Sequence, residues 1–190
     1  MYLTIPNILT LLRIMAIPVF AICVWYGQLV IACILFAMAG LTDLLDGFIA
    51  RRLNQFSDLG AFLDPMADKL LMTVAFVLMS MPSSSLYIKI PLWVAILAIA
   101  RDVIIGLFAL LSTSGFDPAR FKPSLLGKIT TTVELIVISV VLICNAAEST
   151  EWAGFLFPWS FYVVAFLVVA SGLHYFIRAS GNPRKPHVIQ

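Results

Sequence analysis

Residues 8–26 read ILTLLRIMAIPVFAICVWY, and within this run only Arg13 carries a charge. An α-helix rises about 1.5 Å per residue, so about 20 apolar residues are needed to cross the hydrocarbon core of a bilayer. Similar apolar runs follow at 29–49, 61–81, 90–111, 125–144 and 152–176. Because these runs are apolar at nearly every position and do not alternate, they predict helices and not the strands of a barrel. The sequence therefore predicts an all-α, polytopic membrane protein built as a bundle of six transmembrane helices.

The composition supports the same conclusion. The 190-residue chain is 62% hydrophobic and 12% charged, which leaves too little polar surface to cover a water-soluble globule. The net charge of +2 is too small to indicate a nucleic-acid partner. The first apolar run is expected to stay as a helix and not to be a cleaved signal peptide, because Arg13 lies inside it and no basic tail precedes it. Residues 1–179 are predicted to form one transmembrane domain, and residues 180–190 a flexible cytoplasmic tail.

The basic residues predict the orientation of the bundle. With six crossings, both termini and the loops after the second and fourth helices share one side of the membrane. Eleven of the twelve Lys and Arg residues lie on that side or in the parts of the helices closest to it, and Lys89 is the exception. The positive-inside rule therefore places both termini in the cytoplasm.

Acidic residues gather where the second and third predicted helices meet. Five of the ten acidic residues lie between Asp43 and Asp68. Asp43 and Asp46 are three residues apart and Asp64 and Asp68 are four apart, so each pair lies on one face of its helix. A charged Asp at the centre of a transmembrane helix costs about 3 kcal/mol, so such carboxylates need a cation or a water-filled cavity. Two antiparallel helices joined by a short turn can point both pairs at one another, which predicts a divalent-metal site.

The ligand chemistry narrows the choice of metal. A site made only of oxygen ligands favours magnesium, manganese or calcium, and the absence of His and Cys from the cluster argues against zinc or iron. Two such ions can clamp a diphosphate. Gly47 and Gly60 flank the acidic pairs, which is consistent either with a nucleotide close to the backbone or with tight helix packing through Gly47 and Ala50. Cys23, Cys33 and Cys144 show no metal or redox spacing and are interpreted as packing residues.

The acidic pairs belong to a longer pattern. It reads Asp43-Leu-Leu-Asp46-Gly47-Phe-Ile-Ala50-Arg51 and, after eight intervening residues, Gly60-Ala-Phe-Leu-Asp64-Pro-Met-Ala-Asp68. This gapped pattern resembles the signature of the CDP-alcohol phosphatidyltransferase family at every fixed position. The resemblance implies a six-helix fold with a polar cavity that faces the cytoplasm. It also implies the transfer of a phosphatidyl group from CDP-diacylglycerol to an alcohol, with release of CMP.

The resemblance also implies roles for single residues. Three carboxylates would bind the divalent ions, expected to be two Mg²⁺ or Mn²⁺, and a fourth would act as general base and also as a ligand. The three are Asp43, Asp46 and Asp64, and the fourth is Asp68. The cytidine diphosphate site would be lined by Gly47, Ala50, Arg51 and Gly60. Homodimers are common in the family.

The first residues of the chain indicate which members of the family it resembles most. Residues 5–13, Ile-Pro-Asn-Ile-Leu-Thr-Leu-Leu-Arg, look like the start of bacterial phosphatidylglycerophosphate synthases and of CMP-forming cardiolipin synthases. This implies an enzyme of the bacterial inner membrane that uses either glycerol 3-phosphate or phosphatidylglycerol as acceptor. The N-terminal half favours glycerol 3-phosphate. The run Gly127-Lys128-Ile129-Thr130-Thr131 lacks one lysine that phosphatidylglycerophosphate synthases often show before the fifth helix. The Lys122-Pro123-Ser124 stretch looks more like cardiolipin synthases.

Basic residues outside the signature are candidates for the acceptor site. Arg101, Lys128 and Lys122 are predicted to bind a phosphate of the acceptor, because guanidinium and ammonium groups are the usual phosphate partners. The alternative is a structural ion pair of Arg101 with Asp102 or Glu134. Two other classes of membrane protein fit the sequence less well. Membrane prenyltransferases also bind diphosphates through Asp-rich sites but lack the continuation after Asp46, and a transporter would not explain four carboxylates at one edge of the membrane.

Overall fold

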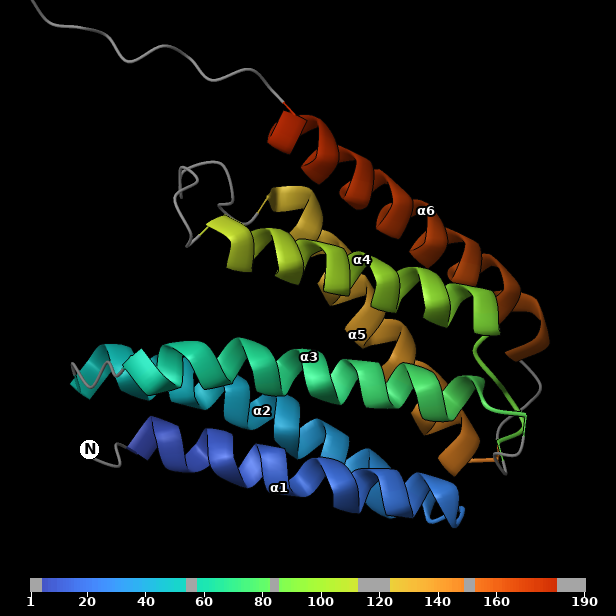
Figure 1. Cartoon of the computed structure of the whole chain (residues 1–190). Helices are drawn as coiled ribbons and strands as arrows, with labels where there is room; N and C mark the ends of the chain where they lie inside the picture. Colours follow the sequence, from blue (N-terminus) through green and yellow to red (C-terminus); the bar gives the residue numbers. More distant parts are fainter. Residues whose placement is uncertain (1–4, 54–57, 83–85, 113–123, 149–152, 181–190) are drawn as a thin grey trace, which may run out of the picture.

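The computed structural model describes residues 5–53, 58–82, 86–112, 124–148 and 153–180. For residues 5–6, 44–53, 58–59, 61–62, 108–112, 153–156 and 178–180 it describes the backbone alone. Within these ranges the chain forms α-helices and no strands (Figure 1). The helices are α1 (Ile5–Trp25), α2 (Leu29–Leu53), α3 (Asp58–Ser80), α4 (Leu92–Ser112), α5 (Leu125–Ala146) and α6 (Ala153–Ser180). The predicted six-helix, all-α fold is confirmed.

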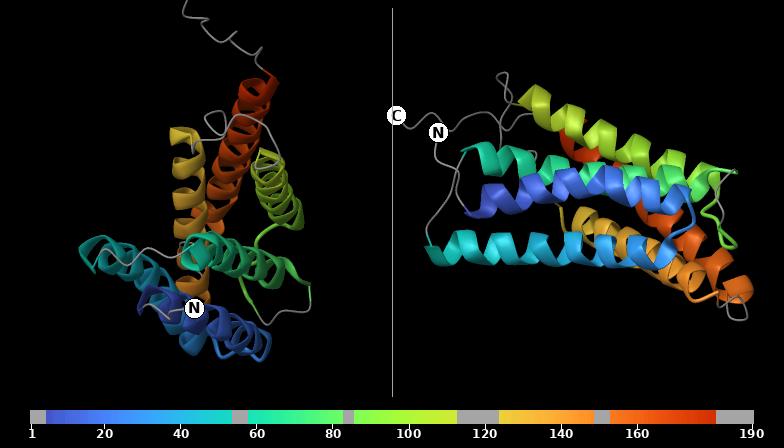
Figure 2. Two further views of the ribbon diagram at one scale, coloured as in Figure 1. Left: turned by 60° about the vertical axis from the view of Figure 1, so that its left-hand side comes forward. Right: turned by 90° about the horizontal axis from the view of Figure 1, so that it is seen from below.

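The helices form two groups. Helix α1 packs against α2 and α3, whereas α4 and α5 both pack against α6. Contacts of α5 with α2 and of α3 with α4 join the groups, and Figure 2 shows them from two further directions. Successive helices run in opposite directions. The start of α1, the junction of α2 with α3, the junction of α4 with α5 and the end of α6 therefore lie at one end of the molecule, on the left of Figure 1. We call this end the junction end.

The outer surface of the bundle is apolar. Large hydrophobic side chains such as Met15, Phe166 and Ile177 are exposed, while Phe20, Val141 and others fill a buried core. Within the described residues, three segments are long and apolar enough to cross a bilayer, and α2 contributes a shorter apolar segment. The three are Asn7–Trp25, Leu125–Ala146 and Phe157–Ile177, and the shorter one is Leu29–Asp43. An apolar exterior around a helical bundle is the arrangement that lipid requires, so the chain is a membrane protein.

At the end opposite the junction end, one buried amide holds the segment before α4. The Asn145 side chain on α5 accepts a hydrogen bond from the Ile88 N–H and donates one to the Ile88 carbonyl, both at 3.0 Å. These two bonds pair the N–H and the carbonyl of Ile88. They stabilise the connection, because unpaired backbone groups are costly where water is absent. The link ties the α3–α4 connection to the C-terminal end of α5.

We expect the junction end to face the cytoplasm. In a background in which Cys23, Cys33 and Cys144 are replaced by Ser, a membrane-impermeant maleimide should label Tyr87→Cys in intact cells. The same reagent should label Gln190→Cys only after lysis. Tyr87 is exposed and lies before α4, at the end that carries few basic residues. Labelling of Tyr87→Cys only after lysis would show that the orientation is the reverse.

Candidate functional site

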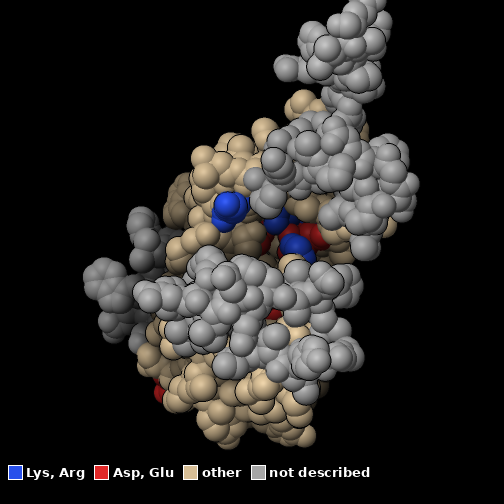
Figure 3. Space-filling model, turned by 90° about the vertical axis from the view of Figure 1, so that its left-hand side faces the viewer, with Lys and Arg blue, Asp and Glu red and all other residues tan. Residues whose placement is uncertain are grey.

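Buried polar side chains gather toward the junction end. They include Thr10 and Arg13 on α1, Arg101 on α4, Thr130 and Glu134 on α5 and Ser171 on α6. Figure 3 looks onto this end and shows acidic and basic side chains close together near the middle of the face. Polar and charged groups at this depth are costly unless they are paired or serve a function. The junction end is therefore the candidate functional site.

Side chains of α1 hold two of the aspartates predicted to bind metal. An Arg13 amino group contacts Asp43 Oδ1 at 2.6 Å, and the Thr10 hydroxyl donates a hydrogen bond to Asp64 Oδ1. Thr10 and Arg13 are one helical turn apart on the same face of α1, and each is 3% exposed or less. The aspartates come from α2 and α3, so α1 binds the two acidic helices together. It also fixes the direction in which each carboxylate points.

Asp68 lies one turn beyond Asp64 on α3. It is half-buried, and the charged groups that act on it most strongly are Asp43, Lys69, Arg13 and Asp102. Asp43 belongs to a different helix from Asp68, so the packing brings one carboxylate of α2 within electrostatic reach of one on α3. The like charges of Asp43 and Asp68 repel unless a cation lies between or near them.

The remaining signature residues divide into described and undescribed positions. Gly60 is buried on α3. The side chains of Asp46, Ala50 and Arg51 and the surroundings of Gly47 lie outside what the structure describes, although their backbone is helical. Among the described residues, no three acidic, His or Cys side chains lie close enough together to hold a metal ion. The described donors, Asp43, Asp64 and Asp68, are all carboxylates, and such donors fit Mg²⁺ or Mn²⁺ better than zinc or iron.

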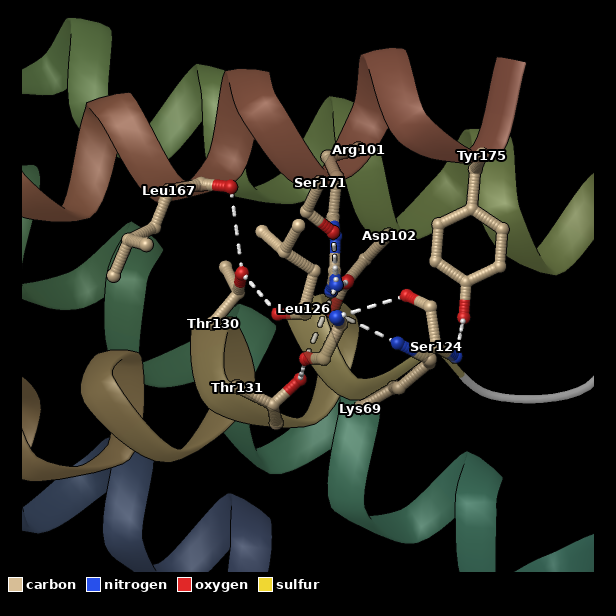
Figure 4. A network of polar contacts seen from close by, with 11 residues as sticks. Lys69, Arg101, Asp102, Ser124, Leu126, Thr130, Thr131, Leu167, Ser171 and Tyr175 are labelled. Carbon is tan, nitrogen blue, oxygen red and sulfur yellow. Dashed lines mark hydrogen bonds and ion pairs between the residues drawn. The ribbon is translucent and has the colours of Figure 1, made fainter. Parts of the chain in front are cut away.

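A second polar network crosses four helices around Arg101, which is 6% exposed (Figure 4). One Arg101 amino group contacts Asp102 Oδ1 at 2.6 Å, and the other donates to Ser171 Oγ at 2.9 Å and to the Gly127 carbonyl at 3.3 Å. The Arg101 Nε–H also donates to Ser171 Oγ at 3.3 Å. The other oxygen of Asp102 contacts Lys69 Nζ at 3.0 Å. The network therefore connects α3, α4, α5 and α6 next to Asp68.

The start of α5 is built to hold this network in place. Ser124 caps the helix, because its hydroxyl accepts a hydrogen bond from the Gly127 N–H at 3.0 Å. The Ser124 N–H in turn donates to the Tyr175 hydroxyl on α6 at 3.0 Å. A Cβ atom at Gly127 would lie 3.2 Å from both Ser124 Oγ and the Tyr175 ring. A side chain at position 127 would therefore crowd Ser124 and Tyr175, which would have to shift by a few tenths of an ångström to admit it.

The predicted acceptor residues differ in their positions. Arg101 is buried in the network, and its contact with Asp102 is one of the internal ion pairs that the sequence offered as an alternative to phosphate binding. Lys128 is exposed on the first turn of α5, and Lys122 lies outside the described residues. Four of the five Arg101 N–H groups take part in the contacts given above. A phosphate would therefore compete with Asp102 for the guanidinium or bind beside it.

Several residues of the site carried little signal in the sequence. Arg13 stood out only as a charge inside an apolar run, Lys69 only as a basic neighbour of Asp68, and Ser171 did not stand out at all. A lone Ser in a transmembrane helix more often packs or bonds to its own backbone than binds a guanidinium. The pairing of Ser171 with Arg101 spans 70 residues of sequence, so only the packing of α4 against α6 reveals it.

A groove with a volume of about 270 Å³ runs between α4 and α6 beside the Arg101 network. Its walls are almost entirely apolar and include Leu97, Ile104, Val168 and Leu173, with Arg101 and Tyr175 among the lining residues. The groove therefore places a surface suited to hydrocarbon next to a buried cation.

Comparison with known proteins agrees with this description. The model of the CDP-alcohol phosphatidyltransferase family matches residues 3–175. The CDP-diacylglycerol–glycerol-3-phosphate 3-phosphatidyltransferases of Escherichia coli (strain K12) and Salmonella typhimurium (strain LT2) are each 34% identical to this chain over 186 residues. The alignments cover 96% of this chain and 98% of each relative. The enzyme of the same name from Shigella flexneri serotype 5b is 33% identical over the same length.

Proposed function

Because this chain belongs to the CDP-alcohol phosphatidyltransferase family, we propose that it transfers the phosphatidyl group of CDP-diacylglycerol to glycerol 3-phosphate and releases CMP. The observation that carries the choice of acceptor is the full-length similarity to relatives named for glycerol 3-phosphate. The proposal is also supported by the charged groups of the site, since Arg13 is buried against Asp43 of α2, and Lys69 and Arg101 both contact Asp102 of α4.

The donor lipid would bind at the α2–α3 junction. Asp43, Asp46 and Asp64, with Asp68 as an additional ligand, would hold divalent cations, two Mg²⁺ or Mn²⁺, whose charge stabilises the diphosphate and the leaving CMP. Thr10 and Arg13 keep two of these carboxylates in place. The cytidine diphosphate would contact the family positions of the second and third helices, which are Gly47, Ala50, Arg51 and Gly60.

The chemistry is a single displacement at phosphorus. The acceptor hydroxyl oxygen forms a bond to the β-phosphorus of the CDP-lipid, the bond from that phosphorus to the bridging oxygen breaks, and CMP leaves with the bonding electrons. Asp68 takes the hydroxyl proton as the new bond forms and later passes it to water. The position of Asp68, one turn beyond Asp64 on α3, suits a group that faces the acceptor.

The acceptor phosphate would bind on the α4–α5 side of the site. Arg101 and Lys128 would contact it from these two helices, together with Lys122, and the charge of Lys69 lies next to Asp102 in the same network. This side is adjacent to Asp68, because Lys69 follows it directly on α3. A phosphate monoester held here would present its free hydroxyls toward the carboxylates.

One observation favours a second candidate acceptor. The apolar groove between α4 and α6 has Arg101 in its wall, and a groove of this kind suits a phospholipid whose headgroup phosphate is near the guanidinium and whose chain lies in the groove. With phosphatidylglycerol as acceptor the chain would be a CMP-forming cardiolipin synthase. The Lys122-Pro123-Ser124 resemblance points the same way.

The acceptors can be separated by product analysis. Purified protein in detergent is given radiolabelled CDP-diacylglycerol with glycerol 3-phosphate, phosphatidylglycerol or glycerol, and the lipids are resolved by thin-layer chromatography. We expect product from glycerol 3-phosphate and none from glycerol. Lys128→Ala should raise KM for glycerol 3-phosphate several-fold with a smaller effect on kcat, because an exposed ammonium contributes binding energy before and during the reaction alike.

Thr132→Ala is the matched control, since Thr132 is exposed on the same helix. Product from phosphatidylglycerol alone would identify a cardiolipin synthase instead. An unchanged KM in Lys128→Ala would remove Lys128 from the acceptor site.

The setting of the enzyme follows from the same proposal. We place the site on the cytoplasmic face of a bacterial inner membrane, where a water-soluble acceptor can reach it while the donor stays in the lipid. The homodimer that the family resemblance implied stays a prediction.

A further inference from the structure

Glu134 is a buried acidic residue that the reaction described above does not use. It lies on α5, is 2% exposed, and belongs to the inward face of that helix with Gly127, Thr130 and Val137. Its Oε1 atom has no hydrogen-bond partner among the described residues. In either protonation state a buried carboxyl oxygen needs a partner, because it has lost its bonds to water. The position therefore calls for a partner that is not part of the described chain.

The surroundings of Glu134 are those of the acceptor side of the site. The charged groups that act on it are Asp102, Arg101, Lys69 and Asp68. Asp68 and Lys69 belong to α3, and Arg101 and Asp102 to α4, so Glu134 faces the space where these helices meet α5. Both the proposed base, Asp68, and the proposed phosphate-binding cation, Arg101, are therefore within electrostatic reach of Glu134.

An internal salt bridge does not account for Glu134. Arg101 directs its N–H groups to Asp102, Ser171 and the Gly127 carbonyl, and Lys69 contacts Asp102. Within the described contacts, neither cation bonds to Glu134. Two carboxylates, Asp68 and Asp102, also act on it and repel an ionised form. A neutral hydroxyl, which can donate a hydrogen bond without adding negative charge, fits the site better than an anion does.

We propose that Glu134 accepts a hydrogen bond from the hydroxyl of the acceptor that does not react, and so selects a short polyol monophosphate. The inference rests on the proposed function and adds a specificity residue to it. The acceptor then meets three groups of different chemistry. Its phosphate lies toward Arg101, its attacking hydroxyl toward Asp68, and its remaining hydroxyl toward Glu134. A site built to bond a hydroxyl discriminates against a substrate that lacks it, because the buried group is then left without a partner.

The test compares two acceptors that differ only in that hydroxyl. Glycerol 3-phosphate and 3-hydroxypropyl phosphate share the phosphate and the primary hydroxyl, and the second lacks the C2 hydroxyl. We expect kcat/KM of the unmodified enzyme to favour glycerol 3-phosphate by about 10- to 100-fold, the usual scale for a hydrogen bond to a charged or buried group. Glu134→Ala should reduce this ratio to near one, mainly through loss of activity on glycerol 3-phosphate. Glu134→Gln, which keeps the shape and one accepting oxygen, should give an intermediate ratio.

Thr132→Ala, on the exposed face of the same helix, should leave the ratio unchanged. If Glu134→Ala and Glu134→Gln lower activity on both acceptors by the same factor, Glu134 is structural and the inference is overturned. The same holds if the unmodified enzyme uses the two acceptors equally well. If the unmodified enzyme makes no product from glycerol 3-phosphate but does so from phosphatidylglycerol, the proposed function fails first and the inference fails with it.

Discussion

Asp64→Asn is expected to lower the rate of CMP release from CDP-diacylglycerol by more than about a hundredfold, because loss of even the outer partner of a metal ligand commonly costs 10- to 100-fold. The change removes the charge that would bind Mg²⁺ or Mn²⁺ but keeps an oxygen that can accept the hydrogen bond from Thr10. The bundle should therefore stay folded, and the loss of one negative charge should relieve repulsion among the carboxylates in metal-free protein. Activity measured with Mg²⁺, with Mn²⁺ and with excess EDTA completes the test.

Asp43→Ala and Asp46→Ala are expected to abolish activity for the same reason. Asp43→Ala also removes the 2.6 Å contact with buried Arg13, so its thermal stability should fall more than that of Asp64→Asn. Glu148 is an exposed acidic residue just beyond the C-terminal end of α5, away from the junction end. Glu148→Gln therefore serves as the control and should keep full activity. Full turnover in EDTA, or near-normal turnover of Asp64→Asn, would show that the carboxylates do not hold a catalytic metal.

Asp68→Asn is expected to reduce kcat by roughly a hundredfold or more, the usual scale for loss of a general base, while CDP-diacylglycerol still binds. The asparagine has the same shape but cannot take the proton of the attacking hydroxyl. The measurement pairs steady-state kinetics with equilibrium binding of CDP-diacylglycerol in the presence of the metal. Met66→Leu, an exposed change on the same helix, is the control for effects of mutation on α3.

Two other results would change the role of Asp68. A near-normal kcat would mean that another group takes the proton or that no base is needed. Loss of CDP-lipid binding together with loss of metal binding would make Asp68 chiefly a ligand. The charges of Lys69 and Asp102 both influence Asp68, and the two residues form an ion pair with each other. Lys69→Gln therefore tests whether this ion pair affects the function of Asp68. A fall in kcat in that variant would show that the network around Arg101 affects the ability of the Asp68 carboxylate to take the proton.

The fold class, and the acidic faces of the second and third helices, could be predicted from the order of the residues. Long runs such as 8–26 can satisfy their backbone in lipid only as helices, so the helices could be predicted almost to their ends. The spacing of Asp64 and Asp68 placed them on one face, since 3.6 residues per turn is a property of any α-helix. Both conclusions depend only on the geometry of an α-helix and on the chemistry of the surrounding lipid. The sequence is enough to apply both.

Which helices bring their polar groups together could be seen only from the packing of the bundle. The contacts of Arg13 with Asp43 and of Arg101 with Ser171 join residues 30 and 70 positions apart, and the inward position of Glu134 depends on where α5 crosses between the two helix groups. In a bundle that is apolar on nearly all faces, hydrophobic periodicity does not say which face of a helix is buried. That choice is made by packing and by the few hydrogen bonds available in a medium without water, and both appear only when the helices are assembled.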